Sequence, residues 1–118
     1  MKAIWYEGFG PAEEVLTQGE MQDPVPGPGE VLVRVRASGV NPSDVKLRAG
    51  ARPGAQMEFP RIVPHSDGAG EIVALGEGVD RRVGERVWIW NGQWQRPFGT
   101  AAELIALPSA QAVALPEG

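Results

Sequence analysis

The sequence of 118 residues has no cysteine and only one histidine, His65. Without cysteine, disulfides, iron–sulfur clusters, zinc–thiolate sites and cysteine nucleophiles are excluded. A single histidine leaves little material for any other metal site. Basic residues are also few, since eleven stand against fifteen acidic residues and the formal net charge is −4. Because domains that bind nucleic acid usually carry a basic excess, we expect no nucleic-acid partner. The shortage of cysteine and histidine leads us to expect no bound metal.

Long apolar runs are missing too. The first ten residues lack the apolar stretch of roughly 7–15 residues that a secretory signal contains. The least charged segment, 97–116, contains Glu103 and is interrupted by Pro108. It cannot supply the ~20 apolar residues that a membrane-spanning helix needs. The sequence therefore predicts a cytoplasmic protein that has no membrane partner.

Glycine and proline, in contrast, are abundant, with sixteen and eleven residues, about twice their average share. So many turn-forming residues disfavour a helix bundle. In the clearest strand pattern, 31–36, three valines alternate with Leu32, Arg34 and Arg36, which is the period of a half-buried strand. Further strands are predicted at 2–6, 15–21, 71–75, 83–90, 101–107 and 111–115. We expect a single, mostly β domain built as a partly open barrel with one or two short helical turns.

One segment, 41–50, has the pattern of a short helix instead. Asn41 is a suitable N-cap and Pro42 suits the first helical position. Asp44 places a carboxylate near the positive end of the helix, and Gly50 stands where a left-handed residue is favoured. This helix would follow directly after a strand, so its polar first turn would lie at a strand end.

Two polar clusters are the candidate functional residues. The first is Asn41, Asp44 and Lys46 on the helical turn, and the second is 65–67, the run His-Ser-Asp. Each also has a purely structural interpretation, as a helix cap with a solvated lysine and as a turn that bonds its own backbone. No phosphate-binding loop, nucleophile elbow or G-x-G-x-x-G fingerprint accompanies them.

Five stretches in order nevertheless resemble one known family. They are PGEVLV at 28–33, SGVNPSD at 38–44, DGAGEIVALG at 67–76, VGERV at 83–87 and FGTAAE at 98–103. Together they are similar to the N-terminal, GroES-like domain of the medium-chain dehydrogenase/reductase superfamily, and the resemblance covers nearly the whole chain. It implies a GroES-like barrel over 1–118. A Rossmann cofactor domain is absent from this sequence, and 115–118 looks like the exit toward it.

Within that superfamily the zinc alcohol dehydrogenases carry cysteine where this chain has Asn41 and the run G-H-E where it has 65–67. The position of the zinc-binding histidine is therefore Ser66, and the lobe with four zinc-binding cysteines is missing. The turn N-P-x-D at 41–44 instead resembles the zinc-independent quinone oxidoreductases, the zeta-crystallin-like branch.

The resemblance implies an enzyme that transfers a hydride from NADPH to a quinone or an activated alkene without zinc. Asn41 would then hold the nicotinamide-ribose end or a substrate oxygen. Lys46, where some members have tyrosine, would stabilise an enolate or hydroquinone anion. Asp44 would orient the turn or contact the cofactor. Ser66 and Asp67 would lie on the cofactor side.

The aromatic loop 88–98 is the candidate wall of the substrate pocket. Trp88 and Trp90 share one face of a predicted strand and are expected to pack the barrel or its rim. Trp94 and Phe98 lie in a polar, turn-rich stretch, and a flat apolar wall there would suit a quinone or enone ring. Arg96 could contact an anion or be exposed.

The resemblance also implies that the intact protein has a covalently linked Rossmann domain and is a homodimer. The 118-residue chain by itself is expected to be inactive or nearly so, with an apolar patch where the cofactor domain would dock. Two alternatives stay open. One is a stand-alone GroES-like interaction or co-chaperone module without catalysis, and the other is a zinc-type alcohol dehydrogenase domain.

Overall fold

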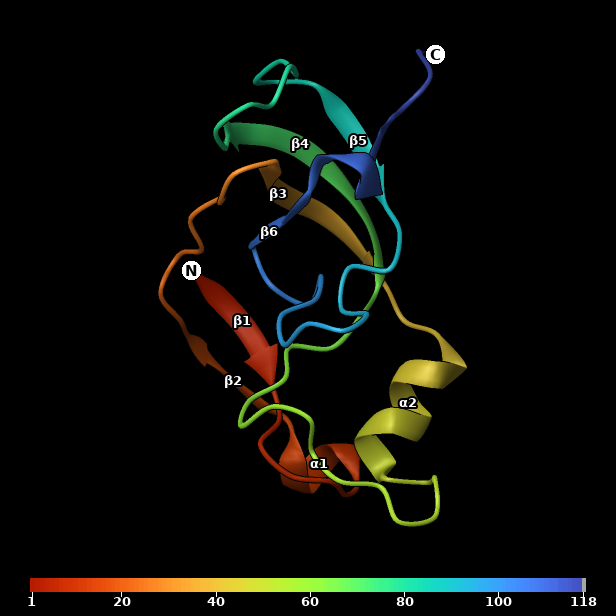
Figure 1. Cartoon of the computed structure of the whole chain (residues 1–118). Coiled ribbons are helices and arrows are strands. Elements are labelled where there is room, and N and C mark those ends of the chain that lie inside the picture. The colour runs from red at the N-terminus through yellow and green to blue at the C-terminus, as the bar shows by residue number, and fades with distance from the viewer. Residues whose placement is uncertain (118) are drawn as a thin grey trace.

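A computed structural model describes residues 1–117 of the chain. Gly118, the last residue of the predicted exit at 115–118, lies outside the described residues. The N-terminal part forms a two-stranded antiparallel sheet from β1 (Lys2–Trp5) and β2 (Thr17–Glu20), and α1 (Ala12–Val15) lies between these strands in the sequence. Figure 1 shows this small sheet beside the larger one, with α1 below it.

The larger sheet has five strands in the order β6-β3-β4-β5-β7, and every neighbouring pair is antiparallel. Its strands are β3 (Glu30–Gly39), β4 (Asp67–Leu75), β5 (Arg86–Ile89), β6 (Leu104–Pro108) and β7 (Ala112–Ala114). The two outer strands, β6 and β7, are separated in sequence only by the 3₁₀ turn η1 (Ser109–Gln111). A connection this short keeps both edges of the sheet close together, so the sheet curves. The predicted mostly β, partly open architecture with short helices is confirmed.

The core lies on the concave side of this sheet and follows the predicted alternation of β3. Val31 and Val33 are fully buried, whereas Arg34 and Arg36, which follow them on the other face, are exposed. The same alternation buries Val87 and Ile89 of β5. The remaining core residues of this cluster are Ile72, Ile105, Leu107 and Ala112. Burial of apolar side chains from every strand is the main force that holds the sheet together.

The starts of four predicted strands are wrong. β4 begins at Asp67 rather than at 71, and β6 begins at Leu104 rather than at 101. Val15 closes the helical turn α1, and strand β2 begins only at Thr17. Pro11 precedes that turn and Glu13 stands in its first turn, and both residue types favour a helix start over a strand. In the predicted strand 83–90, Gly84 has a φ of 94°. This left-handed residue belongs to a turn, so β5 starts at Arg86.

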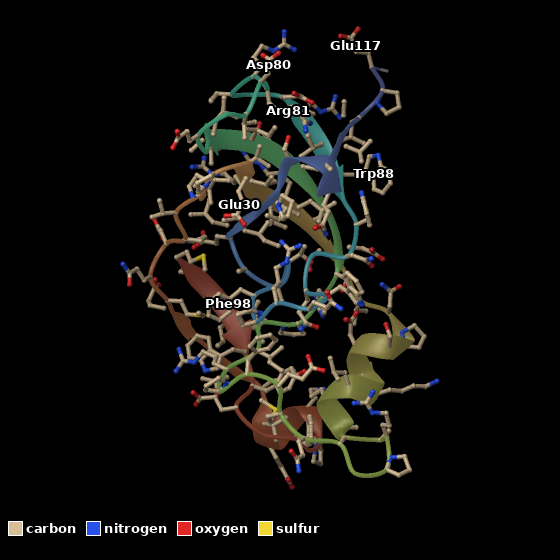
Figure 2. The ribbon with its side chains drawn as sticks, viewed as in Figure 1. Glu30, Asp80, Arg81, Trp88, Phe98 and Glu117 are labelled. Carbon is tan, nitrogen blue, oxygen red and sulfur yellow. The ribbon has the colours of Figure 1, made fainter. Side chains whose placement is uncertain are left out.

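A single arginine ties the end of the chain to the sheet. Arg81 donates to the carbonyl oxygens of Ser109 and Ala112 at 2.9 and 2.8 Å, and to both carboxylate oxygens of Glu85. The hydrogen bonds from Arg81 lower the pKa of Glu85. Figure 2 shows Arg81 near β5 and the final strand. These bonds fix η1 and β7 in place, so the curvature of the sheet does not depend on the β5–β7 pairing alone.

Candidate functional site

The helix predicted at 41–50 forms α2 (Pro42–Ala49), which follows the end of β3 as expected (Figure 1). The backbone N–H of Asn41 donates to the carboxylate of Asp44 at 2.8 Å, and Asp44 is only 8% exposed. Gly50 ends the helix with a φ of 68°, as its position predicted. The carboxylate of Asp44 thus caps the start of α2, as the structural interpretation of this cluster predicted.

The side chain of Asn41, in contrast, reaches across to the next strand. Its Nδ2 donates to the Asp67 carboxylate at 2.7 Å, 26 residues further along the chain. This contact follows from the β3–β4 register, in which Gly39 pairs with Asp67. The structure therefore joins the two polar clusters of the sequence, since Asn41 contacts Asp44 through its backbone and Asp67 through its side chain.

We expect Asn41→Asp to destabilise the fold, because it would set a second carboxylate within hydrogen-bond distance of Asp67. Two like charges this close repel by between about 1 and 4 kcal/mol, depending on their exposure to solvent. Urea unfolding at pH 7 measures the loss. The exchanged pair Asn41→Asp/Asp67→Asn is the matched control and should recover most of the stability. Equal stability of the single and exchanged variants would contradict the Asn41–Asp67 contact.

The structural interpretation of 65–67 expected the His65 side chain to bond the backbone of its own turn. The His65 side chain contacts Ser38 instead. Its Nδ1 lies 2.8 Å from the hydroxyl of Ser38, which lies 2.9 Å from the hydroxyl of Thr100. Thr100 is fully buried, and its hydroxyl donates to the backbone oxygen of Asp67 at 2.8 Å. Sequence reasoning missed Ser38 and Thr100 as parts of the site. Their only signal was that both lie in stretches that resemble the family.

Ser66 and Asp67 begin the strand β4 region from which this network is built. The carbonyl oxygen of Ser66 accepts the backbone N–H of Gly92 at 2.8 Å, so Ser66 fixes the aromatic loop to the start of β4. Asp67 itself is exposed apart from its contact with Asn41. The cofactor-side roles of Ser66 and Asp67 stay predictions.

Lys46 stands one turn further along α2 and lines a cavity of about 410 Å³. The apolar part of the lining comes from Phe9, Leu47, Met57 and Ile62. The charged groups of the lining besides Lys46 are Arg52 and Glu58. A mostly apolar pocket with a few polar groups is the usual form of a small-molecule site.

Gln93 is a lining residue of this cavity that sequence reasoning missed. It is only 8% exposed, and its Nε2 donates to the carbonyl oxygen of Arg96 at 2.9 Å. That bond fixes the amide, so Gln93 is a rigid polar group in the cavity wall. A glutamine in a loop carries no sequence signal of burial, which explains the omission.

The structure does not bring the predicted wall residues Trp94 and Phe98 to the Lys46 cavity. Trp94 is 59% exposed, and Phe98 lines a separate cavity of about 500 Å³ together with Met1 and Arg96. Figure 2 places Phe98 near β1, away from α2. The loop is turned by Asn91 and Gln95, which have left-handed φ values of 50° and 58°. A substrate contact by Trp94 or Phe98 stays a prediction.

The two tryptophans at the start of that loop lie outside the core. Trp88 and Trp90 are 42% and 41% exposed, because Val87 and Ile89 occupy the inward positions of β5. Figure 2 shows Trp88 at the outer margin of the sheet. Arg96 is partly buried rather than exposed, and burial lowers the pKa of its guanidinium.

The only tyrosine of the chain, Tyr6, lies close enough to α2 for the charges of Asp44 and Arg48 to act on it. Tyr6 is fully buried, and within residues 1–117 its hydroxyl has no hydrogen-bond partner. Burial, and to a smaller extent the Asp44 carboxylate, raise the pKa of Tyr6 to about 12.

This shift predicts a specific loss of stability in alkali. The unfolded chain releases the Tyr6 proton near pH 10, whereas the folded chain retains it, so stability is unaffected below pH 10 and falls between about pH 10 and 12 by on the order of 2–3 kcal/mol. Phenolate absorbance follows Tyr6 alone and should show the late midpoint. Tyr6→Phe is the control and should lack this part of the alkaline loss. A titration midpoint near pH 10 in the folded protein would contradict the burial.

Two features of residues 1–117 bear on metals and membranes. No group of three or more histidine, cysteine, aspartate or glutamate side chains gathers closely enough to hold a metal ion. No helix within that range is both long and apolar enough to cross a bilayer.

Comparison with known proteins identifies the family. Residues 27–117 match the model of the alcohol dehydrogenase GroES-like domain. The chain belongs to this family. The GroES-like domain described above is 38% identical over 118 residues to a quinone oxidoreductase of Pseudomonas aeruginosa, covering 99% of this chain and 34% of that protein. It is also 38% identical over 121 residues to the synaptic vesicle membrane protein VAT-1 homolog of Rattus norvegicus, covering 99% of this chain and 28% of that protein.

Solved structures show the same relationship. The GroES-like domain superposes on a crystal structure of the Escherichia coli quinone oxidoreductase complexed with NADPH, with a TM-score of 0.83 and 25% identity. The match covers 98% of this chain and 33% of that one. The chain thus spans only about a third of the length of these relatives. The predicted resemblance to the quinone oxidoreductase group is confirmed.

Proposed function

We propose that this chain is the substrate-side, catalytic domain of a zinc-independent, NADPH-dependent quinone or enone reductase. The observation that carries the proposal is the cavity beside α2, where the Lys46 side chain lines an apolar space of about 410 Å³. The relatives named quinone oxidoreductases and the NADPH complex of one of them support the reaction class.

The chemistry assigned to Lys46 follows from the charge that the reaction creates. Hydride addition to a quinone or enone leaves negative charge on the substrate oxygen, and a cation placed beside that oxygen stabilises the transition state. Lys46 is exposed in this chain, and the apolar residues beside it would exclude water once a substrate fills the cavity, which would strengthen its attraction for the oxyanion. Lys46 would therefore act in the place that a zinc ion occupies in metal-dependent enzymes.

The cofactor would meet the polar edge formed by Asn41, Ser66 and Asp67. When bound, NADPH supplies the hydride. The Asn41–Asp67 contact of 2.7 Å holds the Asn41 amide in one orientation, and Asp44 fixes the turn that carries it. Because the chain has no dinucleotide fingerprint, most of the cofactor affinity must come from another domain. We propose that the intact protein carries a linked Rossmann domain and is a cytoplasmic homodimer.

Joining the chain to the dinucleotide-binding segment of the Pseudomonas aeruginosa relative tests this function. The oxidation of NADPH is followed by absorbance with 1,4-benzoquinone and with an enone as acceptors. We expect turnover by the joined protein and little or none by the 118-residue chain. A folded joined protein that binds NADPH but reduces neither acceptor would refute the assignment. Stoichiometric zinc in the purified active protein would refute the zinc-independent part alone.

A further inference from the structure

The hydrogen bonds between His65, Ser38, Thr100 and Asp67 form a chain whose direction can be deduced. A hydroxyl group has one hydrogen to donate, and a carbonyl oxygen can only accept. The Thr100 hydroxyl lies 2.8 Å from the Asp67 carbonyl oxygen, so its one hydrogen lies in that bond. Thr100 therefore has only lone pairs to offer to its other neighbour.

That neighbour is the hydroxyl of Ser38 at 2.9 Å. Because Thr100 must accept in this contact, Ser38 donates its only hydrogen to Thr100. The Ser38 oxygen therefore has only a lone pair to offer to Nδ1 of His65, 2.8 Å away, and must accept in that contact. Nδ1 must carry the hydrogen. In a neutral imidazole the second nitrogen, Nε2, is then the acceptor.

The surroundings of Thr100 keep this direction from reversing. Thr100 is fully buried, so water cannot replace the Asp67 carbonyl as its acceptor. The backbone N–H of Thr100 also donates to the carbonyl oxygen of His65 at 2.8 Å. This bond ties the backbones of the two residues that stand at either end of the Thr100–Ser38–His65 contacts. His65 itself has a left-handed φ of 81°, a strained conformation for a residue other than glycine that is often found at functional sites. Among the hydrogen bonds of residues 1–117, none involves Nε2 of His65.

We propose that Ser38 and Thr100 are positioning residues that hold neutral His65 with its hydrogen on Nδ1, so that Nε2 is presented as an acceptor for a hydroxyl group of the ligand. The assignment of the tautomer rests on the geometry alone. The ligand class rests on the proposed function, because reduction of a quinone gives a hydroquinone with two hydroxyl donors. Lys46 can only donate, so a protonated product needs a separate acceptor.

Nitrogen NMR can test the tautomer directly, since His65 is the only histidine of the chain. Long-range ¹H–¹⁵N correlation of the ¹⁵N-labelled chain, at a pH where the ring is neutral, should show Nδ1 protonated and Nε2 unprotonated. Thr100→Val removes the acceptor for Ser38, whose hydroxyl can then donate to Nδ1, so the tautomer should switch to Nε2–H. Ser38→Ala should leave a mixture of tautomers. Ser66→Ala, which follows His65 in the sequence but takes no part in these side-chain hydrogen bonds, is the control and should leave the tautomer unchanged.

Two results would overturn the tautomer assignment. One is Nε2–H as the main form in the unchanged protein, and the other is a folded Thr100→Val variant that keeps Nδ1–H. If Thr100→Val does not fold, Ser38→Ala decides, because Ser38 is exposed and its loss leaves the core intact. A Ser38→Ala spectrum identical to that of the unchanged protein would then refute the positioning role.

The ligand part has its own experiment on the joined protein. Saturating 1,4-hydroquinone should shift the Nε2 resonance upfield, as donation of a hydrogen bond to an unprotonated ring nitrogen does. Thr100→Val should lack this shift. A joined protein that reduces benzoquinone while its Nε2 resonance stays unmoved would refute the ligand contact and leave the reductase function standing. Failure of turnover would refute the proposed function without changing the tautomer result.

Discussion

Replacing Lys46 with methionine is expected to lower kcat of the joined reductase about 100-fold, the usual effect of removing one group that stabilises an oxyanion. Methionine retains the apolar stem of lysine and loses only its charge. Lys46 is exposed and makes no ion pair among the described residues, so the thermal midpoint should stay nearly unchanged. The KM for NADPH should also be unaffected, because the cofactor would bind at the Asn41–Asp67 edge.

The chain offers a matched control for this change. Lys2 is its only other lysine, and it is exposed on β1 outside the Lys46 cavity. Lys2→Met removes the same charge from the protein and should leave kcat unaltered. A Lys46→Met enzyme with the kcat of Lys2→Met would exclude Lys46 as the oxyanion partner, and the apolar cavity would then need another cation.

The parts of this molecule that were predictable are those that depend on local spacing. The alternation at 31–36 sets which side chains of β3 are buried, and the residues Asn41, Pro42 and Gly50 set the limits of α2. Each of these patterns acts over a few residues, because a strand has a period of two and a helix ends where its backbone groups find new partners.

The contacts that build the candidate site act over much longer separations. Asn41 meets Asp67 across 26 residues, and Ser38 meets His65 across 27. Both depend on the register between β3 and β4, which includes two shifts near Val33 and Ala37. A shift of one residue turns every side chain to the other face of the sheet. The sequence could name most of these residues, but it could not tell which of them share a face.

The aromatic loop shows a second reason why prediction fails. Asn91 and Gln95 adopt left-handed conformations that glycine usually occupies. The dipeptide Asn91-Gly92 marks a turn in the sequence, but Gln95 gives no such signal. The turns carry Phe98 toward β1 and bury Gln93 beside the Lys46 cavity. Side chains of a loop are therefore placed by contacts with the rest of the fold.

Gly99→Ala is expected to destabilise the domain by about 3 kcal/mol, the upper part of the range for a side chain forced into filled space. A Cβ at position 99 would lie 2.1 Å from the carbonyl oxygen of His65 and 2.7 Å from that of Pro64. Neither oxygen can retreat cheaply, because both are backbone atoms. The His65 oxygen also accepts the Thr100 N–H, and the Gly99 N–H donates to Val63 at 2.7 Å.

The thermal midpoint should fall by roughly 10–15 °C for a domain of this size, measured by circular dichroism on the 118-residue chain. Gly8→Ala is the matched control, since a Cβ there meets no atom within 4 Å and its φ is not left-handed, and it should change stability by less than about 0.5 kcal/mol. Gly99→Ala also links stability to the candidate site, because displacing the His65 carbonyl should disturb the hydrogen bond between Nδ1 of His65 and Ser38. A Gly99→Ala protein as stable as Gly8→Ala would show that segments 63–65 and 98–100 are not packed this closely, and the Thr100–Ser38–His65 chain would lose its support.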